Sequence, residues 1–137
     1  MSTAERQTLQ SEMTNSPSEI ESSTAVIGNS TAERTNSAKD LKSAIDALIS
    51  VIGDRVSRSK SDLEVHGQSE SYFPTTPPDA VAYPESTEEV AQIVKVCAAH
   101  GCPLTGWGIG SSLEGHALAL EGGIVVDFSR MNKVLDV

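Results

Sequence analysis

The chain has 137 residues, enough for one ordinary domain, and it carries a formal net charge of −9. Its ten Lys and Arg residues are scattered singly, so the sequence offers no basic face for nucleic acid and is repelled by anionic membranes. No apolar run reaches the length of a transmembrane span, and the N-terminus lacks the apolar core of a secretory signal.

The first 37 residues differ in composition from the rest. They are rich in Ser, Thr, Glu and Asn and contain no aromatic residue, so they cannot bury enough apolar surface to offset chain entropy. We predict a disordered tail over residues 1–37, a helix and a covering loop over residues 38–78, and part of a larger domain over residues 79–137.

The first ordered element is predicted to be an amphipathic helix over residues 38–52. Ser37 is its expected N-cap, and Gly53 is a natural C-terminal stop. Apolar residues recur at helical spacing and form one stripe, which needs a surface to pack against. The stripe consists of Leu41, Ala44, Ile45, Leu48, Ile49 and Ile52.

Residues 54–78 are predicted to be irregular, and Pro74, Pro77 and Pro78 interrupt regular structure there. Val56 and residues 63–65 are the only strand-like fragments of this segment. A segment of this kind often covers a sheet edge or a ligand. His66 is interpreted as a solvent-exposed loop histidine, with a ligand contact as the alternative.

The pattern becomes clearer from residue 79 onward. A short strand is predicted over residues 80–83, followed by a helix in which Ser86 and Glu89 form a capping box and Gly101 marks the end. Its expected buried stripe is Val90, Ile93, Val94, Cys97 and Ala98. Cys97 is therefore interpreted as a small buried apolar residue, and the two cysteines lack the partners of a zinc site.

Further strands are predicted over residues 102–105 and 124–128. Strand, helix and strand in this order make a right-handed β-α-β unit with parallel strands. Residues 134–137 resemble the start of another strand, which is the pattern expected of a truncated chain.

A glycine-rich loop joins the two later strands. Gly106, Gly108, Gly110 and Gly115 leave its backbone almost bare, so successive N–H groups can form a concave anion site for a phosphate or pyrophosphate. The dinucleotide pattern G-x-G-x-x-G fails in both registers, and the P-loop pattern lacks its Lys and Ser/Thr. A glycine-rich turn without any ligand is the alternative.

Three segments then carry a resemblance to a known family: residues 78–90, residues 112–116 and residues 126–131. Together they resemble the start of the FAD-binding (PCMH-type) domain of vanillyl-alcohol-oxidase flavoproteins, in the branch of D-lactate dehydrogenase (cytochrome) and the glycolate oxidase FAD subunit. The resemblance implies an α+β fold, of which this chain contains the first of two FAD-binding subdomains.

The resemblance also implies that the glycine loop binds the FAD pyrophosphate. Relatives that attach FAD covalently through this loop carry a His where Gly110 stands, so binding here is expected to be non-covalent. No metal is expected to bind. The implied cofactor-binding residues are Gly108, Ile109, Gly110, Ser111, Ser112, Gly115 and His116.

For the full-length protein, the resemblance implies oxidation of a D-2-hydroxy acid such as D-lactate or glycolate, with hydride transfer to flavin and electrons passed to cytochrome c or another acceptor. The catalytic residues are expected outside this chain, which alone is expected to be inactive. The implied location is mitochondrial in a eukaryote and cytoplasmic in a bacterium. Two alternatives stay open: another flavoenzyme of the superfamily, such as an alkyl-dihydroxyacetone-phosphate synthase, and a short non-catalytic binding module.

Overall fold

The computed structural model describes residues 30–137, and the fold below is that of the compact unit formed by residues 37–137. Of the disordered tail predicted over residues 1–37, residues 1–29 lie outside the described residues and stay a prediction, whereas residues 30–37 are helical. The elements are α3 (Ser30–Ile52), η1 (Gly53–Arg55), β1 (Val56–Ser57), α4 (Lys60–His66), β2 (Ala80–Ala82), α5 (Thr87–Ala99), β3 (Leu104–Trp107), β4 (Ile124–Asp127) and η2 (Phe128–Arg130).

The four strands form one mixed sheet in the order β1-β2-β4-β3. β2 and β3 both pair with β4 in parallel, as the sequence predicts, while the two-residue β1 is antiparallel to β2. Val125 at the centre of β4 lies between Val81 and Thr105. Because β2, β3 and β4 run in parallel, the chain leaves all three at the same edge of the sheet, the edge at which open α/β sheets bind ligands.

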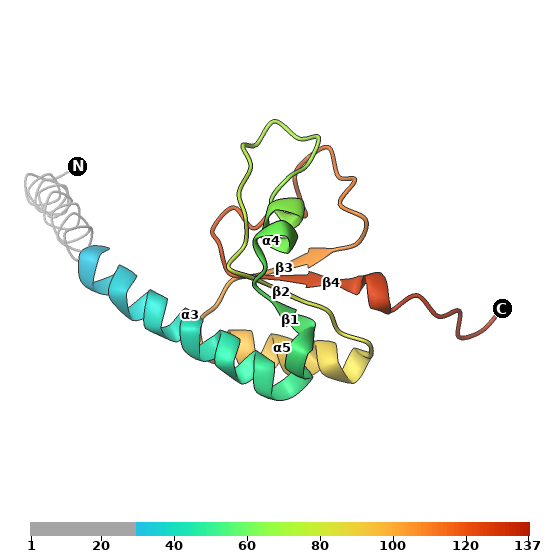
Figure 1. Cartoon of the computed structure of the whole chain (residues 1–137), viewed down its shortest axis with the longest axis horizontal. Helices are drawn as coiled ribbons and strands as arrows, with labels where there is room; N and C mark the ends of the chain where they lie inside the picture. Colours follow the sequence, from blue (N-terminus) through green and yellow to red (C-terminus); the bar gives the residue numbers. More distant parts are fainter. Residues whose placement is uncertain (1–29) are drawn as a thin grey trace, which may run out of the picture. The chain divides into compact units, whose positions relative to one another are not determined.

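The two faces of the sheet are covered differently (Figure 1). On one face α3 and α5 pack together over an aliphatic core, which we call the helix face. On the other face α4 and the long loops cover a smaller cluster, which we call the loop face. The helix face buries Ile45, Leu48, Ile52, Ala80, Ala82, Ile93, Cys97, Ile124 and Val126. The loop face buries Val81, Trp107, Ala117, Ala119 and Val125.

Helix α3 confirms the predicted stripe in part. Ala44, Ile45, Leu48 and Ile52 are buried, but Ile49 is 45% exposed because it lies at the margin of the stripe. The helix begins at Ser30, eight residues before the predicted start, so Ser37 lies inside it and is not the N-cap. The end at Ile52 agrees with the prediction, and Gly53 follows with a φ of 66°.

Val56, predicted to be strand-like, lies in the two-residue strand β1, but residues 63–65, also predicted to be strand-like, lie in helix α4. β1 adds a strand to the sheet edge, and α4 is a seven-residue helix capped by Ser59, whose hydroxyl accepts the N–H of Asp62 at 3.2 Å. α4 is too short and too polar to show a helical period in the sequence. Its position against β2 depends on tertiary contacts that local sequence does not display.

Helix α5 confirms the predicted cap, because the Ser86 hydroxyl accepts the N–H of Glu89 at 3.2 Å. The reciprocal half of the capping box differs: the Glu89 carboxylate accepts the N–H of Glu85 at 2.7 Å. Ile93 and Cys97 are buried as predicted, whereas Val94 is 46% exposed and Ala98 is exposed. The buried side of α5 is therefore rotated toward Val96, which packs against the helix-face core.

The strand predicted over residues 134–137 is absent from the described chain, where residues 131–137 have no regular structure. Val134 and Leu135 are exposed. A strand needs a neighbouring strand for its backbone hydrogen bonds, and this segment pairs with neither edge of the sheet.

Candidate functional site

The glycine loop leaves the carboxyl end of β3 and returns to the sheet surface at residues 117–119, which are buried in the loop face. Gly110 has a φ of 70° and Gly115 a φ of 72°, a left-handed backbone that residues with a Cβ adopt only under strain. The loop thus turns sharply at two glycines, and the sequence predicted both of them as part of a bend.

The N–H groups in the first part of this loop, over residues 109–111, are available to a ligand. Within residues 30–137, no hydrogen bond uses the N–H of Ile109, Gly110 or Ser111. Gly115 differs, because its N–H donates to the carbonyl of Ser112 at 3.4 Å. Three free donors in a bare loop meet the requirement for holding an anionic oxygen, and so they fit a diphosphate group.

A shallow pocket of about 250 Å³ lies against the loop. Its lining gathers six of the seven predicted cofactor-binding residues. The full lining is Gly106, Gly108, Ile109, Gly110, Ser111, Ser112, His116 and Ala117. Gly108 has open space where a Cβ would stand, so ligand atoms can approach its backbone closely.

Gly115 is the predicted residue that this pocket does not include. It is buried, and an added Cβ would lie 2.7 Å from Cδ2 of Phe73. Its role here is to let the loop pack under the covering segment. His116 is exposed, with Nδ1 3.3 Å from the Ser112 hydroxyl, and it lines both this pocket and a neighbouring one of about 400 Å³ next to Phe73.

His66 is the residue that the sequence interpretation places wrongly. It is 4% exposed, at the C-terminal end of α4, and both ring nitrogens are engaged. Nε2 lies 2.8 Å from the Asp127 carboxylate and Nδ1 lies 2.7 Å from the Asp62 carbonyl. Asp127 ends an otherwise apolar strand, and a buried carboxylate needs a polar partner. The sequence did not indicate that His66 is that partner.

Asp127 is held in its ionised form. Burial alone would raise the pKa of its carboxyl, but hydrogen bonds from His66 and from the N–H of Ser129 lower the pKa below its ordinary value. The Ser129 N–H donates to the other carboxylate oxygen at 2.7 Å. Asp127 therefore joins the end of β4 to α4 and to η2.

Two aromatic side chains enclose the His66 ring. The Trp107 ring lies 4.7 Å away between centroids, tilted by 55°, and the Tyr83 ring lies edge-on at 6.0 Å. Burial, together with the nearby Asp62 and Asp127 carboxylates, raises the pKa of Tyr83 to about 12, so its phenol is neutral. The sequence analysis assigned no role to Trp107 or Tyr83.

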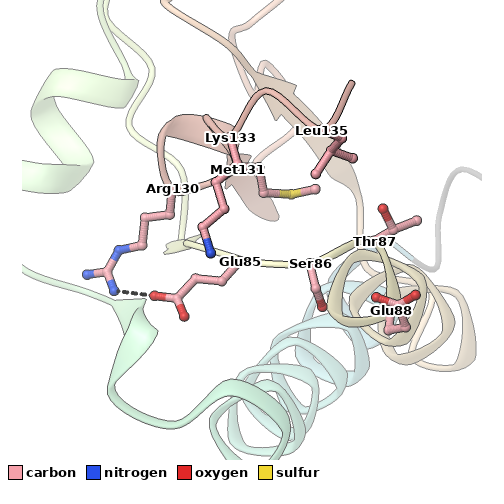
Figure 2. Close-up of a pocket in the computed structure, with 8 residues that line it drawn as sticks. All are labelled: Glu85, Ser86, Thr87, Glu88, Arg130, Met131, Lys133 and Leu135. Atoms are coloured by element: carbon pink, nitrogen blue, oxygen red, sulfur yellow. Dashed lines mark hydrogen bonds and ion pairs between the residues drawn. The ribbon is translucent and has the colours of Figure 1, made fainter. Parts of the chain in front are cut away.

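A second pocket, of about 360 Å³, lies where α5 begins and the C-terminal segment passes over it (Figure 2). Arg130 Nη1 donates to the Glu85 carboxylate at 3.1 Å there. Its lining shares no residue with the glycine loop: Glu85, Ser86, Thr87, Glu88, Arg130, Met131, Lys133 and Leu135. With two carboxylates beside its two cations, the pocket has no surplus positive charge for an anion.

An ion pair that does not line this pocket holds the start of α5. The Arg55 guanidinium binds the Glu89 carboxylate with two hydrogen bonds of 2.6 and 2.5 Å. These bonds, and the N–H of Glu85, lower the pKa of Glu89 to about 2. The pair links η1 to the first turn of α5 and is structural.

The cysteines and the helices give two further findings. Cys97 is buried, and burial raises the pKa of its thiol to about 12, which agrees with its interpretation as a small apolar residue. Within residues 30–137, no three His, Cys, Asp or Glu side chains are grouped to hold a metal, and no helix is long and apolar enough to cross a bilayer.

Comparison with known proteins agrees with this geometry. Residues 78–137 match the family described as the FAD binding domain. A 4-ethylphenol oxidase from Gulosibacter chungangensis superposes with a TM-score of 0.63 and 28% identity over 73% of this chain and 20% of its own. The p-cresol methylhydroxylase structure superposes with a TM-score of 0.58 at 18% identity, over 72% of this chain and 20% of its own, and so shows the fold alone.

Residues 78–137 therefore match the FAD binding domain family, and the chain has the α+β fold that the sequence predicted. FAD is the cofactor of this domain type. Within the family the chain is similar to the D-lactate dehydrogenase and glycolate oxidase branch.

Two curated relatives illustrate this similarity. The chain is 36% identical over 98 residues to a probable mitochondrial D-lactate dehydrogenase of Danio rerio, covering 71% of this chain and 20% of the relative. It is 38% identical over 60 residues to the glycolate oxidase subunit GlcD of Bacillus subtilis, covering 44% and 13%. The chain thus spans about a fifth or less of the length of these relatives.

Proposed function

We propose that the glycine loop over residues 108–112 binds the diphosphate of FAD through its backbone N–H groups. The observation that carries the proposal is the set of free N–H groups of Ile109, Gly110 and Ser111 at the carboxyl edge of a parallel sheet. Backbone amides are suited to this task because they are fixed dipoles that add no net charge to an acidic chain.

Each predicted residue then has a defined part in binding. Gly108 allows close approach of the ligand, and Gly110 makes the turn that aligns the amides. Ser111 and Ser112 add hydroxyl donors, and His116 lies beside Ser112 at the rim of the pocket. Gly115 acts through packing against Phe73. Gly110 stands where relatives with covalently attached FAD carry a histidine, so the cofactor is held here without a covalent bond.

We further propose that the full-length protein is an FAD-dependent oxidoreductase of the D-lactate dehydrogenase (cytochrome) type, acting on a D-2-hydroxy acid. The named relatives in fish, plant and yeast support this assignment. Bound FAD would supply the hydride acceptor for such an oxidation. This chain's own contribution is to bind and orient the cofactor, and we assign no catalytic residue within it. The plant and yeast relatives are named as mitochondrial and cytochrome-dependent, which favours that location and acceptor class in a eukaryote.

A second candidate has its own supporting observation. An alkyldihydroxyacetonephosphate synthase structure superposes with a TM-score of 0.56 and 26% identity, over 61% of this chain and 19% of its own. The curated relatives favour the lactate branch, because the chain is 36% identical to the fish enzyme over a longer segment. Substrate assays with D-lactate, glycolate and an acyl-dihydroxyacetone phosphate on the full-length protein distinguish the two. A protein that binds FAD but turns over no substrate would be the non-catalytic binding module.

The loop assignment is tested by titrating the isotope-labelled 137-residue chain with FAD, ADP, pyrophosphate and adenosine while recording amide NMR spectra. We expect FAD, ADP and pyrophosphate to shift the amides of residues 109–112, and adenosine to leave them unchanged. Binding by this chain is expected to be weak, because the family's second FAD-binding subdomain is not part of it. Shifts confined to another surface, or flavin retained through gel filtration without any loop shift, would contradict the assignment.

A matched variant sharpens the test. Gly108→Ala places a methyl group in open space, so the fold should be unchanged, yet the methyl group narrows the approach to the amides. We expect weaker pyrophosphate and FAD binding with an unchanged melting temperature. The control is Lys95→Ala on the exposed side of α5, which should alter neither. Equal binding by Gly108→Ala and the native chain would show that the ligand does not approach the loop at this point.

A further inference from the structure

The glycine loop rests on the Trp107 side chain. An added Cβ at Gly110 would overlap Cζ2 of Trp107 and would lie 2.7 Å from Cη2, so the Gly110 backbone lies directly against the indole ring. Trp107 is 8% exposed and is the last residue of β3. Any rotation of the indole therefore moves the turn at Gly110, where the free N–H groups lie.

Trp107 in turn packs against the His66 ring. The two rings lie 4.7 Å apart between centroids. The imidazole cannot turn without loss, because one nitrogen contacts the Asp62 carbonyl and the other contacts the Asp127 carboxylate. A continuous series of contacts runs from the end of β4 through α4 to the glycine loop.

We propose that His66 is a positioning residue for FAD binding: by fixing Trp107, it holds Gly110 and the free amides of residues 109–111 in the conformation that receives the diphosphate. The inference rests on the proposed function of the loop. It assigns a binding role to α4, to which none of the predicted cofactor-binding residues belongs, because His66 on α4 contacts the indole that supports the loop.

The hydrogen bonds of His66 require a donor at each ring nitrogen. A carbonyl and an ionised carboxylate both accept, so both contacts are satisfied when each ring nitrogen carries a hydrogen. A side chain that lacks either donor makes only one of the two contacts. The other ionisable groups around the ring are Asp127 on β4, the carboxyl of Asp62 on α4, and Tyr83 after β2, with the Arg130 guanidinium 5.7 Å above the Tyr83 ring.

The test uses the chain's single tryptophan as a local reporter. In His66→Gln we expect the Trp107 fluorescence and the amide signals of residues 109–111 to shift without added ligand. We expect FAD and pyrophosphate to bind about tenfold more weakly, because the displaced amides no longer converge on the diphosphate. The matched control is His100→Gln, at the C-terminal end of α5, which should change none of these signals. Circular dichroism confirms that each variant is folded.

A second measurement needs no variant. In the native chain, nuclear Overhauser contacts should join the His66 ring to the Trp107 indole and the indole to the Gly110 amide, because these groups lie against one another. The absence of these contacts, or a folded His66→Gln chain with native loop signals and native affinity, would overturn the inference. The two proposals fail separately: a chain whose loop signals shift in His66→Gln, but which binds neither FAD nor pyrophosphate in its native form, contradicts the proposed function alone.

Discussion

The helix face and the loop face of the sheet are built from different chemistry. Beneath α3 and α5 the buried side chains are aliphatic or small, and they include Leu48, Ile93 and Ile124 with no exposed area. On the opposite face the buried set contains a hydrogen-bonded polar pair, His66 and Asp127, beside aromatic rings. The same β4 strand serves both faces, since its alternate residues point to opposite sides.

Because of this difference, the two faces contribute differently to the stability of the domain and to the geometry of the glycine loop. An aliphatic core gains stability from buried area and tolerates rearrangement of similar volumes. A buried polar pair contributes little net stability, because desolvation offsets the hydrogen bond, but its directional contacts permit few alternative arrangements. We infer that the helix face stabilises the domain, whereas the loop face fixes the positions of the amides that meet a ligand. The predictions below test that division.

The largest expected effect is on the helix face. Leu48→Ala removes a fully buried side chain between α3 and the sheet, and we expect a loss of about 2–5 kcal/mol in the free energy of unfolding, measured by denaturant titration. Under native conditions the amide signals of residues 109–112 should be nearly unchanged. A large shift of those signals in the folded variant would show that the two faces are not separable.

The next effect is on the loop face. Gly110→Val forces a β-branched residue to a φ of 70° and into the Trp107 ring, so we expect loss of most FAD binding in the full-length protein and a loss of about 1–3 kcal/mol in stability. The measurement is flavin content per protein after purification.

The matched control for that variant is Gly53→Ala, because Gly53 has a similar φ of 66° with open space where a Cβ would stand. It carries the backbone strain without the contact with Trp107 and without proximity to the loop. Normal flavin content in Gly110→Val, or an equal loss in Gly53→Ala, would count against a specific role of Gly110.

The same division decides what the sequence could predict. The helix face follows from periodicity: the α3 stripe, the Ser86 cap and the parallel strands are local patterns, and they were predicted. Even there, Val94 was wrongly placed in the core, because the spacing of apolar residues gives the buried side of a helix but not its exact rotation. The glycine loop was found from composition alone.

The support of the loop was not predictable in the same way. His66 and Asp127 are 61 positions apart, and only the tertiary fold brings them to 2.8 Å. α4 has too few apolar residues to show a period, and Trp107 looked like one more residue of a glycine-rich stretch. Local signals carry the elements and the candidate loop, whereas long-range polar contacts become visible only in the folded chain.

A smaller effect is expected at the start of α5. Ser86→Ala removes the hydroxyl that accepts the Glu89 N–H, which should lower the free energy of unfolding by about 1 kcal/mol. Ser86→Asp should retain most of that stability, because a carboxylate can cap the same N–H. Denaturant titration of both variants checks the expectation, and equal losses in the two would contradict a capping role.

The smallest effect concerns pH and the Arg55–Glu89 pair, which lies outside both faces and is partly solvent exposed. The pKa of Glu89 is lowered from 4.5 to about 2, so the folded state favours the ionised carboxylate. The stability that this provides is therefore complete above about pH 4.5 and is lost as the pH falls toward 2. Glu89→Gln should be less stable than the native chain at pH 7, and the difference should shrink across that window. Glu88→Gln, one residue away and exposed, is the matched control, and a pH-independent difference for Glu89→Gln would mean that packing rather than charge is responsible.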